Sequence, residues 1–239
     1  MRRINYFAFT LGLFFPTLLV AQKRAADKLD VIFPLAKGTY WVYRGPVESG
    51  SSAGTIRKTI TWKMEITDVI KRQDISAAVV RGFPGDLWWY TEDAKPRDSL
   101  IVQVFPSRFY LLGPNEIQKA LGALRDNKNN LQGLVRESNL FLDFPLVRGK
   151  RFGETELITR TDEFYSWVVG DERQSKMEGI RGVSSARNRT VYTISEFTVG
   201  SHTEFDFVSG VGIVRYMGHH NGTVSDFEMK LVEFHAGNE

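Results

Sequence analysis

The stretch FPLAKGTYW, residues Phe33–Trp41, returns later in the chain in a related form, FPLVRGKRF, residues Phe144–Phe152. Both copies follow the pattern F-P-L-x-[K/R]-G-x-x-aromatic. Proline cannot donate to a β-ladder and therefore suits the first residue of a strand, while glycine turns the chain through left-handed conformations at little cost. Each copy predicts a turn that opens a run of strands. The two copies predict a mature protein of two related halves. The alternative is that the two segments match by chance, because they share common turn residues.

Alternating hydrophobic and polar residues predict strands throughout the first half. Ile60, Trp62, Met64 and Ile66 alternate with polar residues inside Ile56–Val69, which is the period of a half-buried strand. Further strands are predicted at Tyr40–Arg44, Ile75–Arg81, Asp86–Thr91, Leu100–Phe105 and Phe109–Leu112, and a Gly- and Ser-rich loop at Gly45–Gly54.

One helix is predicted between the two halves, from Asn115 to about Asn127. Asn115 can cap the helix, and Ile117, Leu121 and Leu124 recur on one face of it. We interpret this helix as a connector with no catalytic role.

The second half repeats the strand pattern. Strands are predicted at Glu154–Thr159, Phe164–Gly170, Gln174–Val183, Thr190–Val199, Thr203–Val208, Gly212–Met217 and Thr223–Phe234. The last of these keeps its apolar residues on one side only if a bulge shifts the phase once. The fold class predicted is mainly β: an antiparallel meander forming a curled sheet, a half-barrel or a two-part β-structure from two related halves, with one short helix. A single domain, 33–239, would contain the halves 33–113 and 144–239, joined by a connector at 114–143.

The first residues carry an export pattern. Met1–Ala21 reads as a signal peptide with the basic residues Arg2 and Arg3 before an apolar run, and residues 22–32 read as a leader. The chain has no cysteine, so neither a thiol-linked lipid nor a disulfide is available. Loss of the two arginines lowers the formal charge from +3 to about +1, and no basic stripe marks a nucleic-acid partner. We expect a periplasmic or extracellular protein without a transmembrane anchor after cleavage.

The opening FPL-x-x-G-x-x-W-x-Y, the second FPL-x-x-G, the segment GVGIV at Gly210–Val214 and the segment LVEF at Leu231–Phe234 resemble a loose class of exported bacterial proteins. That class consists of uncharacterised β-rich proteins, many of them lipoproteins. The resemblance implies an envelope protein, and it carries over no catalytic residue. The missing lipobox cysteine departs from the lipoprotein members.

Catalytic and metal signatures are weak in this sequence. His219 and His220 are adjacent, so in a strand they point to opposite faces, and nothing fixes an approach of His202 to His235. No zinc spacing, G-x-S-x-G elbow or phosphate-binding loop is present, and we expect no metal and no cofactor. Paired carboxylates such as Glu154 and Glu156, on one face of a predicted strand, could serve a glycosidase, but most β-proteins offer such pairs.

Aromatic residues provide the candidate ligand site. Trp88, Trp89 and Tyr90 are consecutive in a predicted strand, so at least one ring must lie away from the main core. Together with Tyr110 they could form an exposed surface for an apolar ligand, a glycan or a protein. The alternative is that the predicted helix or the other half of the protein covers this second face. Trp89 and Tyr110 are the residues to test first.

Three functions are compatible with these observations. The sequence favours a non-enzymatic exported protein that binds a lipid or other apolar ligand, a glycan or an envelope protein, with an apolar cleft beneath the helix as one site. The alternatives are a hydrolase acting on envelope polysaccharide and a structural or assembly protein with an exposed sheet edge.

Overall fold

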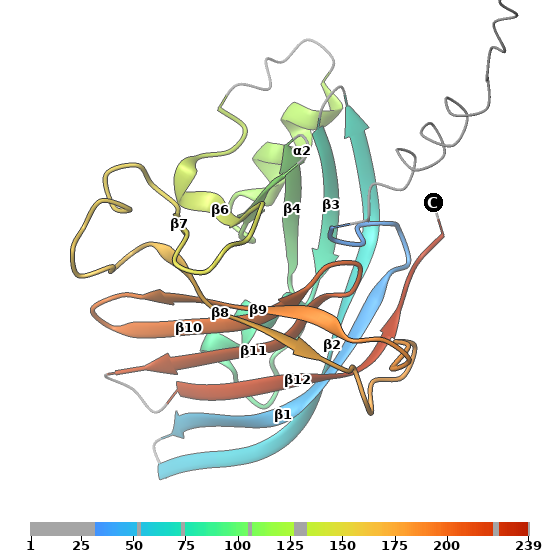
Figure 1. The fold of residues 1–239 in the computed structure, drawn as a ribbon, viewed down its shortest axis with the longest axis vertical. Coiled ribbons are helices and arrows are strands. Elements are labelled where there is room, and N and C mark those ends of the chain that lie inside the picture. Colours follow the sequence, from blue (N-terminus) through green and yellow to red (C-terminus); the bar gives the residue numbers. More distant parts are fainter. Residues whose placement is uncertain are drawn as a thin grey trace, which may run out of the picture. The chain divides into compact units, whose positions relative to one another are not determined.

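Twelve strands form one antiparallel sheet in the order β6-β5-β4-β3-β2-β1-β12-β11-β10-β9-β8-β7 (Figure 1). The strands are β1 (Tyr40–Ser51), β2 (Gly54–Arg72), β3 (Ile75–Arg81), β4 (Asp98–Val104), β5 (Arg108–Leu112), β6 (Leu140–Asp143), β7 (Arg151–Phe152), β8 (Trp167–Ser175), β9 (Arg189–Phe197), β10 (Ser201–Val208), β11 (Gly212–His220) and β12 (Ser225–His235). Two meanders, β1–β6 and β7–β12, are joined through pairing of β1 with β12. The edge strands β6 and β7 contact each other, so the sheet curls until its edges nearly meet. The predicted fold class is confirmed.

The protein is described by a computed structural model that covers residues 32–51, 54–72, 75–104, 107–126, 133–221 and 225–238. All of these residues belong to one unit, Ile32–Glu239. The expected signal peptide, 1–21, and the expected leader apart from Ile32 lie outside the described residues.

The two FPL segments form turns with the same hydrogen bonds. The amide of Gly38 donates to the carbonyl of Ile66 at 2.9 Å, and the amide of Gly149 donates to the carbonyl of Val169 at 2.7 Å. Both glycines have φ of +82°, a backbone conformation that residues with a Cβ atom rarely adopt. These similarities support the prediction of two related halves, which remains a prediction.

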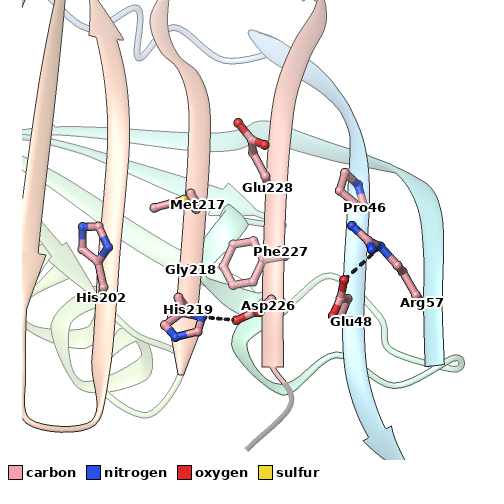
Figure 2. A pocket seen from close by; sticks show the side chains of 10 residues that line it. All are labelled: Pro46, Glu48, Arg57, His202, Met217, Gly218, His219, Asp226, Phe227 and Glu228. Atoms are coloured by element: carbon pink, nitrogen blue, oxygen red, sulfur yellow. Dashed lines mark hydrogen bonds and ion pairs between the residues drawn. The ribbon is translucent and has the colours of Figure 1, made fainter. Parts of the chain in front are cut away.

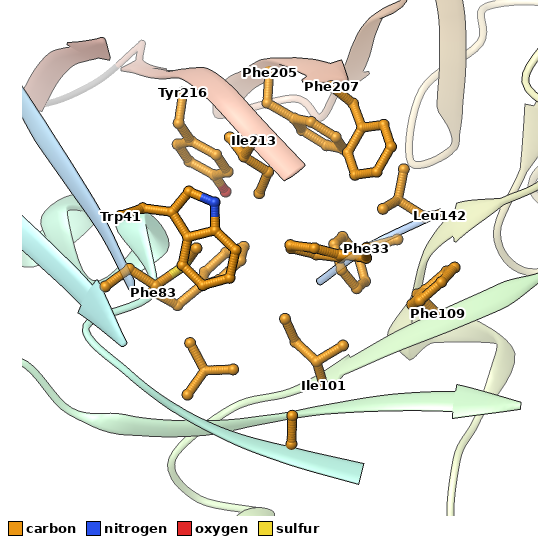
Figure 3. Packing of buried hydrophobic residues seen from close by; sticks show 14 of the residues in the cluster. Phe33, Trp41, Phe83, Ile101, Phe109, Leu142, Phe205, Phe207, Ile213 and Tyr216 are labelled. Carbon is orange, nitrogen blue, oxygen red and sulfur yellow. The ribbon is translucent and has the colours of Figure 1, made fainter. Parts of the chain in front are cut away.

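Aromatic rings fill the interior of the curled sheet (Figure 3). Phe33 and Trp41 meet edge to face at 5.8 Å, and Phe205 and Tyr216 stack at 6.0 Å. The predicted bulge occurs where Tyr43 pairs with Leu231 and Val42 with Glu233, which leaves Val232 unpaired. We call the side of the sheet that bears these rings the core face, and the opposite side the outer face.

Helix α2 (Ile117–Arg125) covers part of the outer face of the first meander, where it contacts β2 and β4. The face predicted from Ile117, Leu121 and Leu124 is buried, as expected. The predicted cap was wrong: the N-cap residue is Glu116, in a helical conformation and without a side-chain cap hydrogen bond. At the other end, the Arg72 guanidinium donates to the carbonyl of Leu124 and stabilises the last turn.

Two predicted strands are replaced by turns. Residues 154–159, expected as a strand, form hydrogen-bonded turns. The strand expected at 174–183 ends with β8 at Ser175, and the loop that follows bends through Gly179 and Gly182, both with positive φ. Gly182 also passes so close to β12 that a Cβ would lie 1.9 Å from the Phe234 carbonyl oxygen. Backbone turns therefore override the strand propensity of both segments.

The prediction of a loop at Gly45–Gly54 was also wrong, because β1 continues to Ser51 and β2 begins at Gly54. A Cβ on Gly45 would lie 1.8 Å from the carbonyl oxygen of Glu228 on β12. Gly45 therefore permits close approach of two strands and does not mark a turn.

Candidate functional site

The segment predicted as an aromatic strand, Asp86–Thr91, is a 3-10 helix, η1 (Pro84–Trp89). Pro84 occupies the first helical position, where its fixed φ suits a helix, and the preceding Gly82 has φ of +76°. The strand prediction followed the high β-propensity of consecutive aromatic residues, and the local backbone overrode it.

The three aromatic residues of this segment have different surroundings. Trp88 is half-buried and meets the Phe227 ring edge to face at 5.4 Å, while Trp89 is 73% exposed. The Nζ of Lys58 lies 5.4 Å from the centre of the Tyr90 ring. Only Trp89 therefore projects fully into solvent.

Tyr110 does not join these residues. On β5 it pairs with Val102 and Leu140 and is 8% exposed, and its neighbour Phe109 points into the core. Alternation along β5 places Tyr110 on the outer face, which α2 covers, whereas Trp88 packs against the core face. The four predicted site residues thus lie on opposite sides of the sheet, and their role in ligand binding remains a prediction.

A different set of side chains forms a continuous row on the outer face at one end of the strands. Neighbouring strands bring the members directly opposite one another, through the pairs Phe197–His202, His202–His219, His219–Asp226, Asp226–Glu48 and Glu48–Arg57. The row therefore crosses six strands, from β9 through β12 and β1 to β2. We call it the histidine–acid row.

The members of this row interact in pairs. His219 Nδ1 lies 2.5 Å from an Asp226 carboxylate oxygen, and Arg57 Nε lies 2.9 Å from a Glu48 oxygen (Figure 2). The Phe197 and His202 rings stack at 3.9 Å. These contacts hold the carboxylates in fixed positions across neighbouring strands.

His202 is the member of the histidine–acid row with a buried polar atom that makes no hydrogen bond within the described part of the chain. Its Nε2 atom is buried without a hydrogen-bond partner among the described residues. Burial lowers the pKa of His202 from its ordinary value of 6.5, because the imidazolium would lose hydration. The side chain is therefore neutral at pH 7.

A charged network lies beside the histidine–acid row. Arg215 on β11 donates to Glu204 at 2.6 Å and to Glu228 at 2.7 Å. The hydrogen bond from Arg215 lowers the pKa of Glu228, which keeps this carboxylate ionised. Farther along the face, the Asp206 carboxylate accepts from Arg173 at 2.7 Å.

Two pockets open on this outer face. The first, of about 390 Å³, is lined by Pro46, Glu48, Arg57, His202, Met217, Gly218, His219, Asp226, Phe227 and Glu228 (Figure 2). The second, of about 570 Å³, is lined by Arg173, Ser175, Lys176, Met177, Glu178, Ile180, Val191, Thr193, Asp206, Val214, Arg215, Glu228, Lys230 and Leu231. Glu228 lines both pockets, and we call the two pockets together the outer groove.

Gly218 links the groove to the core. A Cβ at this position would lie 2.5 Å from the Phe227 ring and 2.8 Å from the Trp88 ring, both on the core face. The missing side chain therefore lets two rings pack beneath the floor of the groove.

The other residues considered from sequence do not assemble. His235 stacks on Tyr40 at 5.1 Å, near the end of β12 opposite to the histidine–acid row. Glu154 and Glu156 are exposed in a turn. Within the part of the chain that the structure describes, no group of three or more His, Asp or Glu side chains could hold a metal ion. No helix of the described residues is long and apolar enough to cross a membrane.

Sequence reasoning missed the acidic members of the histidine–acid row. The alternation of His202, Glu204 and Asp206 with buried residues in β10 indicated a polar outer side. Register across six strands was needed to bring Asp226 and Glu48 opposite each other, and one sequence does not specify it.

Comparisons with known proteins concern the whole sheet. No family model matches the chain, and no curated protein is similar in sequence. A protein assigned as exported, with a YmcC-like fold, from Bacteroides fragilis NCTC 9343 is similar at 10% identity and TM-score 0.40, covering 86% of this chain and 99% of that one. A protein assigned as a lipoprotein from Parabacteroides distasonis ATCC 8503 is similar at 12% identity and TM-score 0.35, with the same coverage. At this level of similarity neither neighbour assigns a function.

Proposed function

We propose that this chain is an exported bacterial envelope protein that binds a polar ligand in the outer groove without converting it chemically. Export is supported by the signal-peptide pattern of Met1–Ala21. The observation that carries the binding role is the histidine–acid row, whose ionisable side chains line an open pocket and are held by fixed pairings. In concave ligand sites a small number of precisely placed polar groups orients the ligand.

A polar ligand fits this structure better than the apolar ligand expected from sequence. The helix expected over an open apolar cleft lies on the outer face, and its buried residues Ile117, Leu121 and Leu124 belong to the packed hydrophobic cluster. The interior of the sheet beside Phe33 and Phe109 is filled with aromatic rings (Figure 3).

The hydrolase alternative receives less support. Glu154 and Glu156, the pair considered for it, are exposed in a turn. An acid–base pair needs one carboxyl group whose pKa is raised beside the substrate, whereas the pKa of the groove residue Glu228 is lowered.

Native mass spectrometry of the protein purified from its own envelope tests this proposal. We expect a bound small molecule in the wild type and in Trp89→Ala, and its loss in Asp226→Asn. Loss in Trp89→Ala alone would move the site to the exposed aromatic residues. A ligand retained by Asp226→Asn and by Glu48→Gln would contradict the groove as the site.

A further inference from the structure

The two pockets of the outer groove differ in charge. Apart from Glu228, which lines both pockets and is bound by Arg215, the first contains the carboxylates Glu48 and Asp226 against the single guanidinium of Arg57. His202 does not reverse this balance at neutral pH, because burial lowers its pKa and disfavours the charged imidazolium. A negative potential in a concave site attracts a cationic group.

The second pocket has the opposite balance. Its cations are Arg173, Lys176, Arg215 and Lys230, and its acids are Glu178, Asp206 and Glu228. Two of those acids are already bound, Asp206 by Arg173 and Glu228 by Arg215. The Lys230 ammonium lies 3.5 Å from a Glu228 carboxylate oxygen, and because the Lys230 side chain is 66% exposed, a ligand carboxylate can also reach this ammonium at the mouth of the pocket.

The distance between the two ends follows from strand geometry. Asp226 and Lys230 both lie on the outer face of β12, where they pair with the outer-face residues His219 and Arg215. They are four residues apart, and a strand rises about 3.3 Å per residue, so their backbones are about 13 Å apart. A fully extended peptide of about four residues has the same length between its termini.

We propose that the ligand of the outer groove is a zwitterionic oligopeptide of about four residues with free termini. Its ammonium terminus binds at Glu48 and Asp226, and its carboxylate terminus binds at Lys176 and Lys230. This inference rests on the proposed function and specifies the ligand class.

The floor of the second pocket adds a side-chain preference. Met177, Ile180 and Leu231 provide apolar surface beside the lysines. An apolar side chain on the last ligand residue would bury surface there, so we expect leucine to be preferred to aspartate at that position.

Calorimetric titration with the tetrapeptide Gly-Ala-Ala-Leu and its capped forms tests this assignment. N-acetylation removes the ammonium, and C-amidation removes the carboxylate. Each cap is expected to weaken binding to the wild type by about twofold to fivefold, the range of an exposed ion pair. The dipeptide Gly-Leu, which cannot span both pockets, is expected to bind more weakly than the tetrapeptide.

Variants locate the two ends independently. In Asp226→Asn the effect of N-acetylation should shrink while the effect of C-amidation persists, and Lys230→Met should show the reverse. Lys71→Met, at an exposed position at the far end of β2, should behave as the wild type. Thermal unfolding of each variant checks that the fold is retained.

Three outcomes would overturn the peptide assignment. Equal binding of free and capped peptides excludes recognition of the termini. Failure of every peptide to bind, while native mass spectrometry shows a ligand that Asp226→Asn loses, excludes the ligand class and leaves the proposed function intact. Absence of any ligand in both experiments overturns the proposed function as well.

Discussion

Phe33 and Phe144, the first residues of the two FPL segments, pack against the same two rings. Phe33 lies 6.0 Å from Phe109 and 5.6 Å from Phe207, and Phe144 lies 6.1 Å and 5.5 Å from the same residues. Phe109 belongs to the first meander and Phe207 to the second. The openings of the two meanders are therefore anchored in one shared aromatic cluster.

This shared cluster predicts that Phe33 and Phe144 contribute differently to the free energy of unfolding. Phe33 is fully buried and Phe144 only half-buried, so Phe33→Ala should lower the free energy of unfolding by about 3–5 kcal/mol. Phe144→Ala should cost less, because it removes less buried surface. Urea unfolding followed by tryptophan fluorescence measures both. An equal or larger loss for Phe144→Ala would contradict this ranking.

The tight packing at Gly218 predicts a second effect. Gly218→Ala would place a Cβ against the rings of Phe227 and Trp88, and we expect a loss of about 1–3 kcal/mol in the free energy of unfolding. Gly122→Ala is the matched control, since Gly122 lies inside α2 with no atom within 4 Å of an added Cβ. That change should stabilise the protein by up to about 1 kcal/mol. Destabilisation by both changes would show that the packing at Gly218 is not the cause.

The Arg160–Asp162 ion pair predicts a shifted titration. Hydrogen bonds from the Arg160 guanidinium lower the pKa of Asp162 from 3.8 to about 2. The contribution of this pair to stability is therefore present above pH 3.8 and is lost as the pH falls toward 2. In Arg160→Gln the pKa of Asp162 should return toward 3.8, as measured by carboxyl carbon NMR. Arg57→Gln, on β2, should leave it unchanged; a shift there, or none in Arg160→Gln, would contradict the assignment.

The sequence predicted most strands of the sheet but not the site. The limits of β3 were predicted to the residue, because Gly82 and Pro84 break the expected strand Ile75–Arg81 directly after its last residue. The prediction of a strand around Trp88 failed because it followed the β-propensity of the aromatic residues. The backbone preferences of Gly82 and Pro84 favour the turn and the 3-10 helix that the structure has there. The outer groove depends on cross-strand register and on a bulge, which are properties of the assembled sheet.

The half-buried side chain of Glu196 predicts a pH-dependent stability. Glu196 lies on the core face, opposite Thr203 on β10 and Trp167 on β8. Burial raises its pKa above the ordinary value of 4.5, because the carboxylate would lose hydration. The carboxyl group of Glu196 releases its proton at a lower pH in the unfolded chain than in the folded protein. Its contribution to the free energy of unfolding is therefore highest below pH 4.5 and falls as the pH rises through the pKa of Glu196 in the folded protein.

Replacing Glu196 by glutamine should remove this dependence. Glu196→Gln is expected to be more stable than the wild type at pH 7, and the difference should vanish near pH 3, where both side chains are uncharged. Urea midpoints at the two pH values measure the effect. Glu154→Gln, in an exposed turn, serves as the matched control and should change neither midpoint. A Glu196→Gln protein that is less stable than the wild type at pH 7 would show that the carboxylate has a partner that stabilises its charge in the folded protein.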